Sequence, residues 1–126
     1  VMNYELAYPI WNLLGISGKV EEARRRASER EANALSVRLE LQADCLAGVW
    51  GFHANRARHV LESGDVEKAL TAATAIGDDT LQRNAGRGIS PDSFTHGSSE
   101  QRVRWFRRGI ETGDMRQCDT FASRQL

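Results

Sequence analysis

Apolar residues recur along this chain at steps of three and four, which is the spacing of one face of an α-helix. The clearest stripe comprises Leu35, Leu39, Ala43, Leu46, Trp50 and His53. It lies in a proline-free region from Val20 to about Leu61 that is rich in Ala, Glu, Arg and Leu, which favour helix. The first part of this region, EEARRRASEREA, has almost no apolar face. We therefore expect a solvated helix or mobile connection first and a core helix second.

Two later segments carry signals for helix ends. Asp65 is the expected N-cap of a helix whose apolar stripe stops at Gly77. Ser98 and Gln101 have the spacing of a capping box, and a second apolar stripe follows them. These signals predict one helix before Gly77 and a last helix over about 99–112.

A long loop separates these two helices. Residues 86–98, GRGISPDSFTHGS, hold three glycines and a proline, and a short helical turn is expected just before them, over 80–85. Nowhere does a two-residue alternation of β-branched or aromatic residues indicate a strand. The predicted fold class is therefore all-α, a compact domain of about four to five helices with one long Gly/Pro loop over 86–98.

The N-terminal residues show a helical pattern interrupted by proline. Apolar residues between Leu6 and Leu14 follow helical spacing, and Gly15 or Gly18 is the expected stop. Because proline removes a hydrogen bond and clashes with the preceding turn, we expect the regular helix to begin near Tyr8 or Pro9.

Composition excludes several classes of function. Lys and Arg together number 17, as do Asp and Glu, so no net charge attracts the chain to nucleic acid or an anionic membrane. No apolar run approaches the roughly 20 residues of a membrane span and no signal peptide is apparent, so we expect this chain itself to be soluble. It begins at Val1 without an initiator methionine; we expect a single domain over 1–126 that lacks an upstream region.

The predicted core helix carries the residues best suited to chemistry. Glu40 and Asp44 lie four apart, so a helix places both carboxylates on one face, one turn apart. Such charges repel unless a cation or a donor lies between them, and Arg38 or another arginine is the simplest partner. Cys45 follows directly, but Cys118 is too distant in sequence for a C-x-x-C motif. The two cysteines form either one disulfide or two buried thiols.

Three stretches give the carboxylates a further interpretation: NALSVRLELQADCLAGVWGFH, AATAIGDDTLQ and PDSFTHGSSEQRVRWFRRGIETGDMRQCDTF. Together they closely resemble the bacterial family of neutral zinc metallopeptidases, from about Asn12 to Phe121. In that family, E-x-x-A-D on a core helix supplies a glutamate as the third zinc ligand and an aspartate beside it. The resemblance assigns these two roles to Glu40 and Asp44.

The first helix of that family carries H-E-x-G-H-H-x-x-N-L-L-G, with two zinc-binding histidines and a glutamate that activates the metal-bound water. This chain ends the same stretch as NLLGI. Counting back from it, the two histidine positions fall on Tyr4 and Tyr8, the glutamate on Glu5, the glycine on Ala7 and the next histidine on Pro9. The resemblance therefore implies that the glutamate is kept and both histidine ligands are replaced.

The same resemblance suggests further site residues and a setting. His96, in the long loop, would lie beside the active site and bind or stabilise the oxyanion, and Arg102 would reach back to it from the last helix. The family implies a peptide or protein substrate and an extracytoplasmic, membrane-anchored location. That oxidising location favours a Cys45–Cys118 disulfide, which would tie the C-terminal tail to the site helix.

Tyrosine changes the metal chemistry that we expect. A phenol with a pKa of about 10 must lose a proton before it binds zinc well, whereas a neutral imidazole binds at about pH 7. Glu40 alone cannot hold the ion, so we expect no cofactor in this form and no peptide hydrolysis by the family's route, which leaves Glu5 without a water to activate. Tyr4 and Tyr8 would instead donate hydrogen bonds to Glu40 and Asp44.

Three alternatives stay open. An engineered or repurposed site would use Glu5 as a general base in an apolar pocket, where burial raises its pKa, or would bind a small molecule. The chain would be an active zinc endopeptidase if histidines in fact stand at positions 4 and 8. A protein-interaction module would use the Arg-rich segment from Glu21 to Arg30 to bind acidic partners.

Overall fold

The structure is a computed structural model that describes residues 15–59, 61–62 and 64–126. Its α-helices within these ranges are α2 (Ile16–Arg26), α3 (Glu29–Arg58), α4 (Asp65–Ala75), α5 (Asp78–Asn84) and α6 (Ser99–Thr112). The same ranges hold two short 3₁₀ helices, Pro91–Ser93 and Met115–Cys118. They contain no strand, which confirms the all-α prediction.

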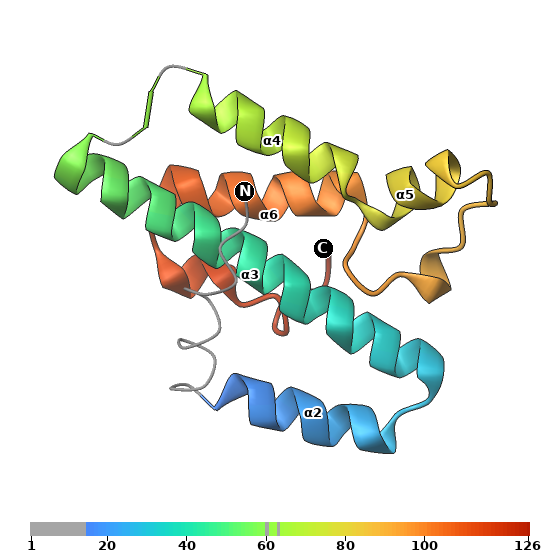
Figure 1. Cartoon of the computed structure of the whole chain (residues 1–126). Coiled ribbons are helices and arrows are strands. Elements are labelled where there is room, and N and C mark those ends of the chain that lie inside the picture. Colours follow the sequence, from blue (N-terminus) through green and yellow to red (C-terminus); the bar gives the residue numbers. More distant parts are fainter. Residues whose placement is uncertain (1–14, 60, 63) are drawn as a thin grey trace.

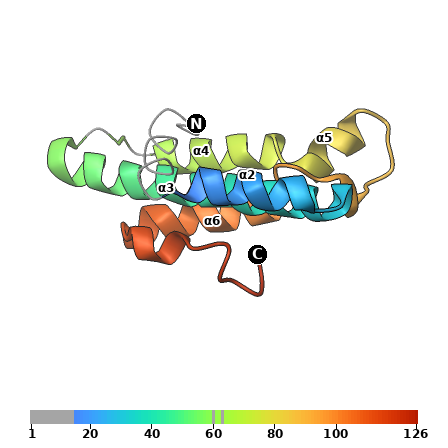
Figure 2. The same ribbon diagram turned by 90° about the horizontal axis from the view of Figure 1, so that it is seen from below.

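Helix α3 is the central element of the molecule (Figure 1). Helix α2 packs against its N-terminal half, and α6 makes the most extensive contact with it. Helix α4 contacts α6 and leads into the short α5. Figure 2 shows α6 and the C-terminal segment on one side of α3, with α4 on the other. The long helix is therefore covered from several directions.

The close approach of α3 and α6 depends on glycines at their crossing. A Cβ atom on Gly48 would lie 2.6 Å from the backbone nitrogen of Ile110, and one on Gly109 would collide with the carbonyl group of Cys45. Helices separated by larger side chains lie about 8–10 Å apart. Glycine at both positions allows the two backbones to come into contact.

The core lies between α3, α6 and the C-terminal segment. Its buried members are Val37, Leu41, Ala43, Cys45, Leu46, Val49, Phe94, Trp105 and Cys118. Cys45 and Cys118 form a disulfide, with their Cα atoms 5.5 Å apart. The tail is also held by hydrogen bonds, since Thr120 Oγ1 donates to the carbonyl of Arg38 at 2.6 Å and Arg38 Nη1 donates to the carbonyl of Ser123 at 2.9 Å. The expected attachment of the C-terminal tail is confirmed.

The helical region expected from Val20 to about Leu61 is two helices. The chain is extended at Ala27, and the side chain of Ser28 caps α3 by accepting a hydrogen bond from the backbone nitrogen of Glu31 at 3.2 Å. Ser28 and Glu31 have the S-x-x-E spacing of a helix start, a signal that the prediction overlooked. Of the two stops expected for the N-terminal segment, Gly18 is wrong because it lies inside α2, whereas Gly15 has a left-handed φ of +70° just before α2.

The buried face of α3 is wider than the predicted stripe. Buried residues run without a break from Leu41 to Val49, because α2, α6 and the C-terminal segment cover different sides of this helix. Trp50 and His53, both expected on the stripe, are exposed, Trp50 by 48%. A one-sided amphipathic pattern describes a surface helix better than a central one.

The predicted N-terminal cap is wrong for α4 and correct for α6. Asp65 is the first residue of α4, and the N-cap is Gly64 with a φ of +89°, so the expected Asp65 cap is wrong. Helix α4 also has no buried residue. In α6, both hydrogen bonds of the capping box between Ser98 and Gln101 are present, as predicted.

The remaining predictions concern the loop and the N-terminus. The long loop over 86–98 is confirmed, interrupted by the 3₁₀ turn Pro91–Ser93, and α5 takes the place of the short turn expected over 80–85. Predictions for residues 1–14 lie outside the described ranges. In the part of the chain that the structure describes, no helix is long and apolar enough to cross a membrane.

Candidate functional site

A buried ion pair joins α3 to α6 where the sequence predicts a site. Arg102 donates twice to Asp44, from Nε to Oδ2 at 2.9 Å and from Nη2 to Oδ1 at 3.1 Å. The two side chains are only 4% and 5% exposed. Arg102 Nη1 also donates to the carbonyl of Ile76 at the end of α4, at 3.5 Å. Arg102 therefore connects α6 to both α3 and α4.

The charge state of Asp44 follows from this setting. Burial raises its pKa from the ordinary value of 3.8 to about 6, against the opposing effect of the hydrogen bonds and positive charge of Arg102. The nearby Glu40 carboxylate adds to the rise. A pKa of about 6 still leaves Asp44 ionised at neutral pH, as a charge-assisted bidentate pair requires. Glu40 is half-buried one turn earlier, so the predicted placement of both carboxylates on one helix face is correct.

The loop that carries His96 is fastened by Asp78. Asp78 Oδ2 accepts hydrogen bonds from the backbone nitrogens of Thr95, His96 and Gly97, at 3.0, 2.7 and 2.8 Å. The backbone nitrogen of Asp78 donates back to the carbonyl of Gly97 at 2.8 Å. Asp78 itself is buried. Four hydrogen bonds thus fix the conformation of the loop at His96.

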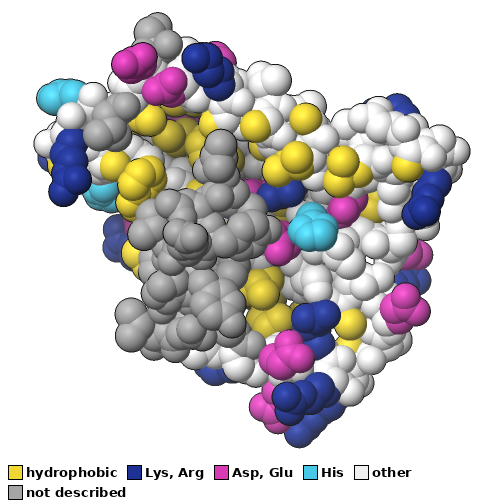
Figure 3. Space-filling view, in the orientation of Figure 1, with side chains coloured by type: hydrophobic (Ala, Val, Ile, Leu, Met, Phe, Trp, Pro, Cys, Tyr) yellow, Lys and Arg dark blue, Asp and Glu magenta, His cyan; other side chains and the backbone are white. Residues whose placement is uncertain are grey.

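The His96 ring lies at the surface beside this anchor. Its Nδ1 atom is 3.5 Å from Asp78 Oδ1 and 3.0 Å from Thr95 Oγ1, and the side chain is 49% exposed. Figure 3 shows that histidine, acidic and basic side chains all reach the surface on the face turned to the viewer. The ring is therefore accessible while its backbone is held firmly. Whether it binds an oxyanion stays a prediction.

A second acidic residue, Asp79, joins α5 to the start of α6. Its Oδ1 accepts a hydrogen bond from the backbone nitrogen of Ser99 at 2.8 Å. The Ser99 hydroxyl donates to the carbonyl of Thr74 and lies 2.7 Å from Thr80 Oγ1. A Cβ on Gly77 would collide with Ser99, so this junction also requires glycine. These hydrogen bonds hold the end of α4, the start of α5 and the start of α6 together.

Asp78 and Asp79 were not predicted as site residues from the sequence. Their hydrogen-bond partners lie 17 to 20 residues further along the chain, beyond the reach of any local pattern. The only local signal is the pair of acidic residues that directly follows Gly77, a composition typical of a helix start. That signal predicts a helix end and says nothing of the loop that the carboxylate holds.

The described residues do not by themselves provide a set of ligands that fits a zinc ion. Within the described ranges, no group of three or more His, Cys, Asp or Glu side chains is placed to hold a metal ion, and positions 4, 5 and 8 lie outside these ranges. Asp44 is already bound to Arg102. The donors that the resemblance leaves are one carboxylate, Glu40, and two phenols with an ordinary pKa of about 10. Protein zinc sites use imidazole, thiolate and carboxylate ligands instead.

Comparison with known proteins identifies relatives of this chain. It is 53% identical over 121 residues to the uncharacterized protein YpfJ of Escherichia coli (strain K12), a match that covers 96% of this chain and 42% of that relative. It is 37% identical over 135 residues to the uncharacterized protein Rv2575 of Mycobacterium tuberculosis (strain ATCC 25618 / H37Rv), which covers 100% of this chain and 44% of that relative. The chain therefore spans less than half the length of these curated relatives.

The family can be read from a match that covers nearly the whole chain. No solved structure gives a significant match. The family profile described as putative neutral zinc metallopeptidase matches residues 1–121, a range that includes Glu40, Asp44, His96 and Arg102. The chain therefore belongs to the putative neutral zinc metallopeptidase family.

Proposed function

We propose that this chain is a metallopeptidase-family domain that does not hydrolyse peptides by the zinc route in its present form. One inference from the sequence supports the proposal: by the family resemblance, Tyr4 and Tyr8 stand where the motif has its two histidine ligands. A tyrosine must lose a proton at a pKa of about 10 before its oxygen binds zinc well. Without bound zinc, no water is activated for Glu5 to deprotonate.

In this proposal the former metal site serves the stability of the fold. Asp44 and Arg102 form a buried bidentate pair between α3 and α6. A carboxylate has about four acceptor positions, so Asp44 retains capacity for a further donor. Tyr4 and Tyr8 would supply such donors to Asp44 and Glu40, replacing electrostatic attraction to a metal with hydrogen bonds.

The setting proposed for the chain follows the family. A peptide or protein is the substrate class that the family description implies, and an extracytoplasmic location fits the resemblance. The Cys45–Cys118 disulfide supports that location, because disulfides persist mainly in oxidising compartments. We also propose that residues 1–126 form one domain of a longer protein, in keeping with the length of the relatives.

Metal content tests the proposal directly. We would measure the intact mass of the purified chain and quantify its zinc by elemental analysis, beside a Tyr4→His/Tyr8→His variant and a matched Tyr4→Phe/Tyr8→Phe control. We expect no stoichiometric zinc in the wild type or the phenylalanine control and a gain of zinc in the histidine variant. One zinc per wild-type chain of the correct mass would contradict the proposal.

A further inference from the structure

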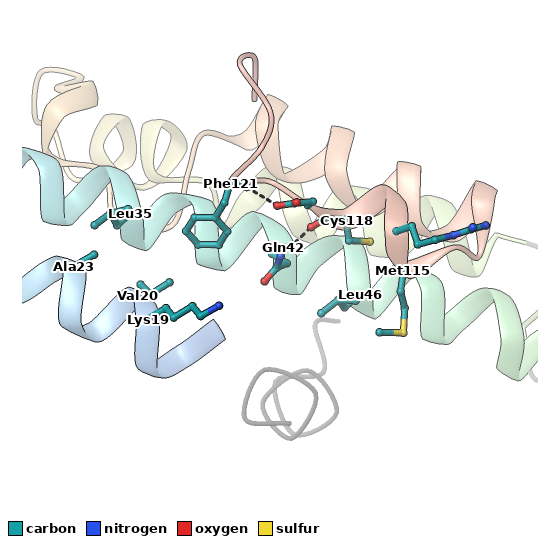
Figure 4. A pocket seen from close by; sticks show the side chains of 11 residues that line it. Lys19, Val20, Ala23, Leu35, Gln42, Leu46, Met115, Cys118 and Phe121 are labelled. Atoms are coloured by element: carbon teal, nitrogen blue, oxygen red, sulfur yellow. Dashed lines mark hydrogen bonds between the residues drawn. The ribbon is translucent and has the colours of Figure 1, made fainter. Parts of the chain in front are cut away.

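A cavity of about 630 Å³ lies between α2, α3 and the C-terminal segment (Figure 4). Its wall is mainly apolar and includes Val20, Ala23, Leu35, Leu46, Met115 and Phe121. Such a volume falls within the range of about 300–1,000 Å³ that is typical of small-ligand sites. These sites usually combine apolar walls with a few well-placed polar groups.

Gln42 supplies one such polar group. It is 5% exposed, and its Nε2 donates to the carbonyl of Cys118 at 3.1 Å, which fixes the orientation of the amide. Its Oε1 atom is buried and accepts no hydrogen bond from the described residues. Figure 4 shows this oxygen turned away from Cys118, toward the side of the cavity formed by α2. A buried acceptor that is left unpaired is unfavourable, so a ligand that donates a hydrogen bond to it gains affinity.

Charged residues lie at the edge of the same cavity. Arg116 is held by Asp114 through two hydrogen bonds at 3.0 Å, and Asp119 accepts backbone hydrogen bonds from Phe121 and Ala122 within its own turn. Lys19 is exposed and forms no ion pair with any residue in the described ranges. None of the described carboxylates therefore competes with an anionic group on a ligand for its ammonium group.

The cavity is separate from the site around Asp44. Gln42 and Asp44 are two residues apart on α3, and at about 100° per residue they point to faces roughly 200° apart. The face of α3 that carries Gln42 lines the cavity together with α2 and the C-terminal segment, whereas Asp44 faces Arg102 on α6. A ligand in the cavity would therefore leave the ion pair intact.

We propose that this cavity binds the C-terminal residue of a peptide with an aliphatic side chain. The side chain would occupy the apolar wall around Val20 and Leu46, the backbone N–H of that residue would donate to Gln42 Oε1, and its carboxylate would pair with Lys19. A peptide of this kind matches three features together: the apolar volume, a buried acceptor that is unpaired among the described residues, and the Lys19 ammonium group at the edge, which pairs with no described carboxylate. The inference does not depend on whether the chain binds zinc.

N-acetyl-L-leucine is the probe that tests the proposal. Titration into the isotope-labelled chain, followed by NMR through the methyl signals of Val20 and Leu46 and the side-chain amide of Gln42, should give saturable shifts at millimolar concentration. An analogue in which an ester oxygen replaces the N–H should bind about fivefold more weakly, the value of one hydrogen bond. Saturation with no preference for the N–H compound, or no saturable shift at all, would overturn the proposal.

Variants separate the contributions of the three features. Gln42→Met should abolish the preference for the amide over the ester, a ratio that does not depend on the stability of the variant. Lys19→Gln should weaken binding of N-acetyl-L-leucine by about threefold without affecting its uncharged amide, N-acetyl-L-leucinamide. The matched control is Lys68→Gln, which changes the only other lysine, on α4. Equal effects of the two lysine variants would overturn the assignment of Lys19.

A variant that fills the cavity tests the proposal independently of whether Gln42→Met folds. Ala23 is exposed on α2 and lines the cavity, so Ala23→Phe should block the probe while preserving the fold. Ala57→Phe places the same ring on an exposed position of α3 outside the cavity lining and should leave binding unchanged. Unchanged binding in Ala23→Phe would place the ligand elsewhere and overturn the proposal.

Discussion

The charge of Asp44 is subject to two opposing effects, burial and the neighbouring Arg102 guanidinium. Burial disfavours the carboxylate charge, whereas the guanidinium favours it through two hydrogen bonds. The net effect is a pKa of about 6, which is above the value of an exposed aspartate. Breaking such a buried pair by removing one partner typically costs about 3–5 kcal/mol, because the other charge stays buried.

The raised pKa of Asp44 predicts how stability depends on pH. The folded chain binds this proton more tightly than the unfolded chain, so the contribution of Asp44 is complete below about pH 4 and is lost as the pH rises through about 6. The loss is about 3 kcal/mol, from a shift of about two pKa units. Chemical denaturation of the wild type and Asp44→Asn across this range should show their difference moving in favour of the variant by that amount.

An exposed aspartate provides the control for this measurement. Asp92 pairs with Arg30 at the surface, where both side chains are mostly exposed, so Asp92→Asn should follow the wild type across the same range. A difference between wild type and Asp44→Asn that stays flat from about pH 4 to about pH 6 would show that Asp44 has an ordinary pKa.

For single residues, the sequence predicts the helix face on which a side chain lies better than it predicts the residue to which that side chain bonds. The i, i+4 spacing of Glu40 and Asp44 correctly predicts a shared helix face, because helical geometry is local. The partner of Asp44, Arg102, lies 58 residues away and was expected at the site only through family resemblance. Asp78 was not anticipated at all, since its three donors belong to a loop without regular periodicity.

Among the elements, the crossing of α3 and α6 is the contact most sensitive to side-chain size. Gly109→Ala would force a methyl group into the carbonyl of Cys45 and so push the helices apart. We expect a loss of about 3 kcal/mol or more in the free energy of unfolding, at the upper end for overpacking. Equilibrium denaturation in urea measures it.

Gly18 on α2 is the matched control for that substitution. A Cβ there would meet no atom within 4 Å, and the residue is helical. Gly18→Ala should therefore stabilise the chain by up to about 1 kcal/mol, from helix propensity. Equal destabilisation by both variants would show that the crossing is not the cause.

Helix ends were predictable where capping residues lie close together in the sequence. The capping box at Ser98 and Gln101 predicted the start of α6 correctly, because both hydrogen bonds form within four residues. The break at Ser28 was missed since composition alone favours helix on both sides of it. The exposure of Trp50 was also missed, because burial of a central helix depends on which neighbours cover it.

On the scale of the whole molecule, the disulfide connects residues 73 apart in sequence. It joins the middle of α3 to the last 3₁₀ helix, so that most of the chain lies within the closed loop. Chain-entropy estimates give about 4 kcal/mol of stabilisation for a loop of this length, through restriction of the unfolded state.

Reduction of the disulfide should therefore lower the free energy of unfolding by about 4 kcal/mol. Thermal and urea denaturation with and without a reducing agent measure this change. A Cys45→Ala/Cys118→Ala variant should lose stability as well and should show no further response to the reducing agent. A wild type whose stability is the same in both conditions would contradict the prediction.

The lack of any buried residue in α4 has a consequence for how the molecule opens. Elements with few buried contacts separate from a fold in local fluctuations, at a free energy well below that of global unfolding. Backbone amides of α4 should thus exchange with deuterium sooner than those of α3, whose residues 41–49 are buried without a break. Because Arg102 donates to the carbonyl at the end of α4, each such opening would also expose one side of the Asp44–Arg102 pair to water.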